Sequence, residues 1–193
     1  MSFIDDDEAL IATALNGSSY AWEKLVKRYE GRIYNYGLRL TGNATDAMDL
    51  MQEVFLGVYR NLHRFRGDAK FSSWIFRIAH NKAIDMNRRR ALIQGRTFSI
   101  EDDENGEYLV PEQTTDNEPD TQLSKGQQNE EIQCMLQKLP MEQRLIVELK
   151  IYQSQTFEEI SKMQEISENT AKTRFYAALK KLKVVMEESH VLS

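Results

Sequence analysis

The sequence predicts an all-α protein made of two small helical domains that are joined by a flexible acidic linker. Apolar side chains recur at spacings of three and four residues over most of the 193-residue chain, as they do on one face of an α-helix. The alternation of Val, Ile and Thr that marks strands is absent, and nine glycines and three prolines are few for a chain of this length. A sharp change of composition in the middle then separates two helical parts.

The predicted linker covers residues 95–126 and lies between predicted domains at 1–94 and 127–193. From residue 97 to residue 124 the chain has no Lys or Arg, but it has nine Asp and Glu residues and two of its three prolines. A segment of this composition buries too little apolar surface to offset the entropy that is lost on ordering it. Two interpretations stay open here: a solvated tether, or an acidic strand that lies in a basic channel of a partner.

The overall composition narrows the class of protein. The formal net charge is −5, and the first residues are acidic where a secretory signal is basic. No apolar run approaches the roughly 20 residues that a membrane span needs. The one cysteine, Cys134, leaves no intramolecular disulfide to form. We therefore expect a cytoplasmic protein.

Four helices are expected in the N-terminal part, at residues 5–17, 18–40, 44–62 and about 71–90. The pair Asn16-Gly17 is the stop signal of the first, and Thr41-Gly42-Asn43 separates the second from the third.

The last part of the chain has the anatomy of a helix-turn-helix motif, which two further helices precede from about residue 127. Thr156 and Glu159 form a capping box at the start of the motif, the turn falls at residues 163–166, and Ser167 is the expected N-cap of the second helix. The second helix is expected to bury one apolar stripe: Ala171, Phe175, Ala178, Leu179 and Leu182.

Burial of this stripe turns Lys172, Thr173 and Tyr176 away from the core. A cation can bond guanine edges or phosphates, a hydroxyl can bond a phosphate, and an aromatic ring can contact a thymine methyl. A helix that presents these groups from its N-terminal half is suited to the major groove of duplex DNA. The plainer interpretation is an exposed face on a generic helical bundle.

A second stretch, residues 60–96, gathers positive charge in an acidic protein. It holds ten Lys and Arg residues against two acids, and these are interleaved with Phe65, Phe71, Trp74 and Phe76. Cations bind phosphates, and flat rings stack on unpaired bases, so this mixture favours strand-separated DNA or a base flipped out of the stack. Most of the apolar residues are also expected to serve the core.

Two segments carry a resemblance to a known family, "DAMDLMQEVFLGVYRNLHRFRGDAKFSSWIFRIAHNKAIDMNRRR" and "LPMEQRLIVELKIYQSQTFEEISKMQEISENTAKTRFYAALKKL". In this order and spacing they resemble bacterial sigma factors of the extracytoplasmic-function group (group 4 of the sigma-70 family), which have only regions 2 and 4. The resemblance implies binding to the β′ clamp helices and β flap of core RNA polymerase. It also implies recognition of duplex and single-stranded promoter DNA, and a probable anti-sigma factor, possibly membrane-bound.

The resemblance also assigns roles to individual residues. It implies that Phe65 and Asn81 hold a flipped base of the −10 element. The full set of residues that it implies for recognition and melting of this element is Arg64, Phe65, Lys70, Ser72, Trp74, Arg77, Asn81, Asp85 and Arg88. For the −35 element it implies Lys172, Thr173, Arg174, Tyr176 and Lys180. For binding core polymerase it implies Asp46, Asp49, Gln52 and Glu53.

Two other classes of function compete with this interpretation. A helix-turn-helix transcriptional regulator that binds duplex DNA without polymerase would leave the basic, aromatic stretch without a role. An enzyme would need a metal or nucleophile site, and neither Asp46, Asp49 and Glu53 nor the pair Glu187 and His190 makes a di-metal set. We therefore expect no catalysis, metal, cofactor or small-molecule substrate.

Overall fold

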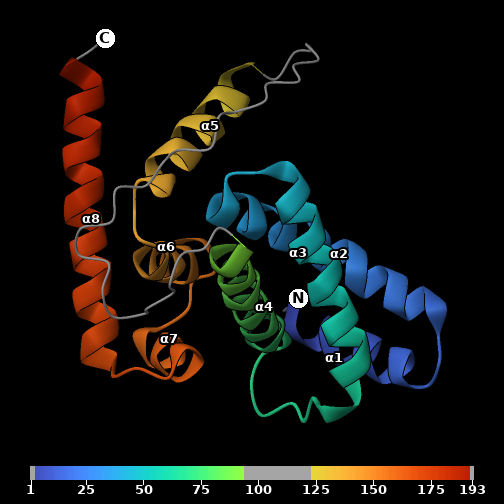
Figure 1. Ribbon diagram of the computed structural model, residues 1–193. Helices are drawn as coiled ribbons and strands as arrows, with labels where there is room; N and C mark the ends of the chain where they lie inside the picture. Colours follow the sequence, from blue (N-terminus) through green and yellow to red (C-terminus); the bar gives the residue numbers. More distant parts are fainter. Residues whose placement is uncertain (1–2, 94–122, 192–193) are drawn as a thin grey trace.

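The computed structural model describes residues 3–93 and 123–191, and every regular element within these ranges is helical, which confirms the all-α prediction. The elements are α1 (Phe3–Leu15), α2 (Ser19–Thr41), α3 (Ala44–Asn61), the 3-10 turn η1 (Leu62–Arg64), α4 (Phe71–Ile93), α5 (Leu123–Gln137), α6 (Met141–Val147), the π-helical turn η2 (Glu148–Tyr152), α7 (Phe157–Gln164) and α8 (Glu168–Val191). They form two helical domains that lie side by side, and both α2 and α4 of the first domain contact helices of the second (Figure 1).

The boundaries of α2 and α3 follow from polar side chains and one glycine. The Ser18 hydroxyl accepts a hydrogen bond from the Ala21 N–H at 3.3 Å, and the Asn43 side chain accepts one from the Asp46 N–H at 3.1 Å. Gly42 ends α2 in the left-handed conformation, with φ of 69°, and its N–H bonds the Leu38 carbonyl. The expected break at Thr41-Gly42-Asn43 is therefore confirmed.

The first helix after the predicted linker overlaps the end of that segment. Helix α5 starts at Leu123, so the last four residues of the predicted linker are helical. The acidic run ends at Asp120, and the residues that follow it no longer oppose a helix. The rest of the predicted linker lies outside the described residues, so the structure does not distinguish the two interpretations of it.

The helix-turn-helix motif is present, but its turn is shorter than the predicted 163–166, because α7 continues to Gln164. The Thr156 hydroxyl and the Glu159 carboxylate form the reciprocal bonds of a capping box. Glu165 ends α7 in the left-handed conformation, with φ of 56°, so a residue other than glycine takes the position that glycine usually occupies in such a turn. The Ser167 hydroxyl accepts from the Thr170 N–H at 3.0 Å as the N-cap of α8. One residue of the predicted buried stripe is not buried. Leu179 is 36% exposed, because it lies at the edge of the stripe, whereas Ala171 and Ala178 are fully buried.

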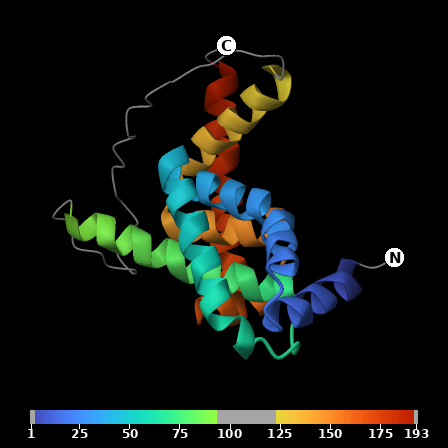
Figure 2. The ribbon, with the colours of Figure 1, turned by 90° about the vertical axis from the view of Figure 1, so that its right-hand side faces the viewer.

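The apolar core is continuous between the two domains. Tyr36 of α2 and Phe76 of α4 are fully buried, and they belong to the same cluster as Ile146, Leu149 and Ile160 of the second domain. A smaller cluster of Leu136, Leu139, Val147 and Ala178 joins α5, α6 and α8. The two domains therefore pack against each other (Figures 1 and 2).

Candidate nucleic-acid and polymerase interfaces

Helix α4 has one buried and one polar face. Ile75, Phe76, Ala79, His80 and Ala83 are buried. The opposite face exposes Arg77, Asn81, Asp85 and Arg88, which are separated by four, four and three residues and so follow one side of the helix. Four predicted −10 residues are thus brought together on a solvent-facing surface. The C-terminal end of α4 projects beyond the neighbouring helices (Figure 2).

An aromatic cluster lies at the N-terminal end of this polar face. The ring of Phe65 lies 5.4 Å from that of Phe71 and 5.5 Å from that of Trp74, between ring centroids. Phe71 is buried, whereas Phe65 and Trp74 keep part of their surface in solvent. The exposed side chains of Arg64 and Lys70 flank the cluster in sequence. Rings and cations are therefore placed side by side, as stacking on a base with phosphate contacts would require.

Ser72 and Trp74, the remaining predicted −10 residues, are both half-buried on the first turn of α4. Their partial burial fits a role in shaping the aromatic cluster as well as a surface role.

His80, next to Asn81, is buried in the core behind the polar face. Its side chain is 2% exposed, and Nδ1 has no hydrogen-bond partner among the described residues. Burial lowers the pKa of His80 to about 4, because the charged imidazolium would lose its hydration. The imidazole is therefore neutral at neutral pH and contributes no charge to the DNA-facing surface.

The acidic face of α3 is only partly available. Asp49 and Gln52 are exposed. Asp46 is instead paired with Arg90 of α4, and the Glu53 carboxylate lies 2.8 Å from the Lys82 ammonium of α4. The hydrogen bond and charge of Lys82 lower the pKa of Glu53.

Sequence reasoning missed this pairing of α3 with α4. Both helices carry the charges, but only their packing shows that Lys82 and Arg90 point to α3 rather than to the polar face of α4. Asp49, Gln52 and Glu53 are therefore exposed and Asp46 is half-buried, and two of the four, Asp46 and Glu53, already have a cation partner on α4.

Helix α8 exposes most of the predicted −35 residues. Lys172, Thr173, Tyr176 and Lys180 are all exposed and lie on one side of the helix, with Tyr176 at 63%. The Lys172 ammonium lies 2.6 Å from the Glu168 carboxylate one turn earlier, an exposed pair that DNA phosphates can readily replace.

Arg174 is placed differently from these four residues. Its guanidinium lies 2.8 Å from the carboxylate of Glu142 on α6, and its side chain is 28% exposed. In this arrangement the side chain ties α8 to α6 and does not extend from the exposed face.

Neither a metal centre nor a membrane span is found in the described part of the chain. It contains no group of three or more His, Cys, Asp and Glu side chains arranged to hold a metal ion. None of its helices combines the length and the apolar character that crossing a membrane requires. The side chain of His190 lies outside the described residues.

Two family models match separate parts of the chain. Residues 25–93 match sigma-70 region 2, and residues 129–182 match sigma-70, region 4. The first range holds the polar faces of α3 and α4, and the second holds the helix-turn-helix.

Several bacterial sigma factors are similar to this chain along most of its length. The RNA polymerase sigma factor YlaC of Bacillus subtilis is 30% identical over 167 residues, which are 86% of this chain and 92% of YlaC. The RNA polymerase sigma-H factor of Pseudomonas aeruginosa is 25% identical over 90% of both chains. The ECF RNA polymerase sigma factor SigE of Mycolicibacterium smegmatis is 29% identical, and the match covers 89% of this chain but 64% of SigE. This chain thus spans less than two thirds of SigE.

Solved structures share the fold. CnrH in complex with the cytosolic domain of CnrY has a TM-score of 0.66 at 21% identity, over 95% of this chain and 98% of that chain. The sigma factor RpoE in complex with the anti-sigma factor NepR from Bartonella quintana has a TM-score of 0.63 at 15% identity, over 86% and 96%. Because regions 2 and 4 follow each other in one chain and the relatives match most of its length, the chain belongs to the extracytoplasmic-function sigma factors of the sigma-70 family, which direct the initiation of transcription.

Proposed function

We propose that this chain binds core RNA polymerase and brings it to promoters by reading the −10 element with α4 and the −35 element with α8. The single observation that carries the proposal is the aromatic cluster at the end of the exposed polar face of α4. Duplex DNA offers no free base face for these rings, whereas a melted −10 element does.

In the proposed −10 site, an aromatic ring and a side-chain amide contact the same base in different ways. Phe65 would stack on a flipped base, and the exposed Asn81 amide would hydrogen-bond the edge of that base. The cations Arg64, Lys70 and Arg77 would bind phosphates of the unpaired strand.

The proposed −35 site is the exposed side of α8. Its N-terminal half would enter the major groove, where Lys172 and Tyr176 contact base edges or a thymine methyl and Thr173 contacts a phosphate. Lys180 would add a phosphate contact, and Arg174 would join only after leaving Glu142.

The proposed contact with core polymerase uses the acidic side of α3 against the β′ clamp helices, and the second domain against the β flap. Asp49 and Gln52 are exposed and would make the first contacts. Asp46 and Glu53 would exchange their intramolecular cations for those of the polymerase.

An anti-sigma factor is the proposed regulator. CnrH was solved with the cytosolic domain of CnrY and RpoE with the anti-sigma factor NepR, so a protein of this class, possibly membrane-bound, is the proposed partner here. We also propose that the chain acts in the cytoplasm, where RNA polymerase works, and that polymerase rather than this chain performs the chemistry. The domain limits 1–94, 95–126 and 127–193 remain predictions.

The test is run-off transcription with purified core polymerase and fragmented genomic DNA, followed by mapping of the start sites. We expect discrete start sites that require this chain and share −35 and −10 elements. A chain that binds duplex DNA tightly by itself and adds no start sites to core polymerase would instead be a helix-turn-helix regulator. Cleavage of DNA by the purified chain with added metal ions would show an enzyme.

A further inference from the structure

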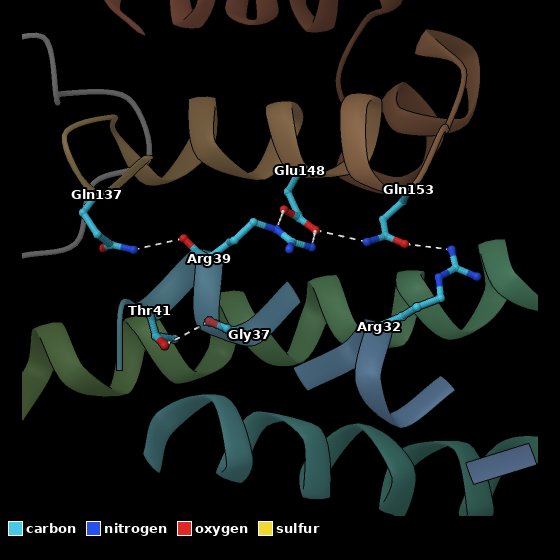
Figure 3. Close-up of polar contacts among 7 residues, drawn as sticks. All are labelled: Arg32, Gly37, Arg39, Thr41, Gln137, Glu148 and Gln153. Atoms are coloured by element: carbon cyan, nitrogen blue, oxygen red, sulfur yellow. Dashed lines mark hydrogen bonds and ion pairs between the residues drawn. The ribbon is translucent and has the colours of Figure 1, made fainter. Parts of the chain in front are cut away.

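The two domains are joined by a polar seam as well as by the apolar core. The Arg39 guanidinium of α2 donates two hydrogen bonds to the Glu148 carboxylate of η2, at 2.6 and 2.7 Å (Figure 3). The Gln153 amide donates to the same carboxylate at 3.0 Å, and Arg32 of α2 donates to Gln153 at 2.8 Å. Side-chain exposure is 16% for Arg39 and 1% for Glu148, so this ion pair is buried.

The second domain also completes the C-terminal end of α2. The last carbonyls of a helix lack partners within the helix and carry partial negative charge. Here Gln137 donates to the Arg39 carbonyl at 3.0 Å, and the guanidinium of Arg144 donates to the Leu40 carbonyl. A helix end in the first domain is therefore capped by two side chains of the second.

The chemistry of the seam makes the contact specific and reversible. Burial raises the pKa of the Glu148 carboxyl, although Arg39 acts in the opposite direction through its hydrogen bonds and charge. A buried ion pair of this kind loses hydration about as much as it gains attraction, so the two groups can return to water at little cost once both are exposed. Removing one partner is different, because the other charge then stays buried and unpaired.

The docked form is too small for the proposed promoter contacts. The names of the −10 and −35 elements imply a separation of about 25 base pairs, or about 85 Å at roughly 3.4 Å per base pair. A folded chain of this length has a radius of gyration of roughly 16 Å and hence a diameter of about 40 Å. The two domains must therefore separate before α4 and α8 can read both elements at once.

We propose that the seam of Arg39, Glu148, Gln153, Gln137 and Arg144 is an autoinhibitory latch, which holds the two domains docked until core polymerase separates them. The proposal rests on the proposed function, because separation matters only if both promoter elements are read. It predicts that the docked fraction of the chain lowers its apparent affinity for core polymerase.

Two variants weaken the latch by different means. Arg39→Gln leaves the Glu148 carboxylate buried without its cation. Gly42→Asn acts as a wedge, because a Cβ at this position would lie 2.9 Å from Cδ of Gln137 and would displace that side chain from its bonds to Arg39 and Arg144. The matched control is Gly17→Asn: Gly17 also has a positive φ, 89° against 69°, but a Cβ there meets nothing within 4 Å. Asn is used in both places because it adopts a positive φ more readily than most residues, so that both variants carry backbone strain but only Gly42→Asn meets Gln137.

The distance between the domains is measured in the full chain by energy transfer between two dyes. One dye is attached to Cys134, which is exposed on α5, and the other to a cysteine introduced by Glu23→Cys on α2. We expect high transfer in the parent chain, a clear loss in Arg39→Gln and Gly42→Asn, and parent-like transfer in Gly17→Asn. Added core polymerase should lower the transfer in every chain.

Affinity for core polymerase is measured in parallel. The two latch variants should bind core about tenfold or more tightly than the parent, and Gly17→Asn should bind as the parent does. Unchanged transfer in Gly42→Asn with native helical content by circular dichroism, or low transfer in the parent, would overturn the latch. If Arg39→Gln does not fold, the comparison of Gly42→Asn with Gly17→Asn tests the latch by itself.

Failure of every chain to bind core polymerase would refute the proposed function. The energy transfer measured without polymerase would still test whether the two domains are docked.

Discussion

Phe65 shows how one side chain serves both packing and proposed recognition. Its backbone N–H bonds the Leu62 carbonyl at 3.0 Å, which fixes the residue just after η1. Its ring then packs edge-on against Phe71 while part of its surface stays in solvent. A ring that is already ordered loses little entropy when a base stacks on it, so this placement suits capture of an unpaired base.

Substitution of Phe65 or Asn81 tests this site. Phe65→Ala removes a stacking contact worth about 1–3 kcal/mol, so open-complex formation should fall by roughly fivefold to 150-fold. Asn81→Ala should reduce it by about tenfold through loss of a hydrogen bond to the base. Promoter opening is followed with a fluorescent base in the −10 element, and core binding is followed by pull-down. Tyr20→Ala, which removes an exposed aromatic ring from α2, is the control that should change neither. Loss of core binding in either variant would contradict the assigned role.

His80 gives the protein a specific dependence on pH. Its folded pKa of about 4 lies below the value of about 6.5 in an unfolded chain, so the unfolded state takes up the proton first as the pH falls. The stability that the neutral imidazole allows is fully present above about pH 6.5 and is lost as the pH falls toward 4. At pH 4.5 the loss should be about 2.5 kcal/mol.

The measurement is the free energy of urea unfolding at pH 7.5 and 4.5. Because carboxyl groups also titrate in this range, the quantity that matters is the difference between parent and variant. His80→Gln should lose about 2.5 kcal/mol less than the parent between these pH values. His63→Gln, at an exposed histidine, should follow the parent. Parallel pH profiles for His80→Gln and the parent would show that His80 is not the titrating group.

At the scale of elements, α3 and α4 are joined through their charges. Asp46 and Glu53 on α3 meet Arg90 and Lys82 on α4, so the proposed polymerase-binding helix and the proposed −10 helix share two ion pairs. The Glu53–Lys82 pair is largely exposed and contributes only about 0–1 kcal/mol, so a polymerase surface with matching cations can displace it. The Asp46–Arg90 pair is half-buried.

Charge reversal at Asp49 tests the polymerase face without disturbing these pairs. Asp49 is exposed and lies between the two paired acids. Asp49→Lys should weaken core binding about tenfold or more, because like charges then face each other across the contact. Affinity is measured by titration of labelled chain with core polymerase. Glu30→Lys makes the same charge change at an exposed position of α2 and should bind normally. Equal affinity for both variants would place the polymerase contact elsewhere.

Element boundaries show where local sequence suffices. The stop at Gly42, the N-cap at Ser167 and the capping box of Thr156 and Glu159 are local interactions within a few residues, and each prediction is confirmed. The exposure of Leu179 and the inward turn of Arg174 were not foreseen, because both depend on how α8 packs against α6.

At the scale of the whole molecule, the docked arrangement predicts weak binding of DNA by the chain alone. We expect the free chain to bind a promoter duplex at least about 100-fold more weakly than its complex with core polymerase, because the docked domains cannot reach both elements. Electrophoretic mobility shifts at fixed salt give the two affinities, since phosphate contacts make binding depend on ionic strength.

Lys172→Ala supplies the specificity control for that measurement. It should lower the affinity of the complex for a −35-containing duplex by about fivefold to 100-fold, while leaving its affinity for a duplex with a scrambled −35 element almost unchanged. Tight binding by the free chain that is insensitive to Lys172→Ala would favour a regulator that acts without polymerase.

The sequence alone determined the all-α class, the helix-turn-helix and the helix faces, because apolar periodicity and capping are properties of neighbouring residues. A charged residue inside an apolar run, Glu148 between Val147 and Leu149, was the one local signal of the seam. Its partner Arg39 lies 109 positions away, so no local pattern joins them. Only the tertiary structure decided that the two domains pack together, that Asp46 and Glu53 are already paired and that His80 is neutral. Burial and distant charges set each of these outcomes, and a sequence does not state which distant residues will meet.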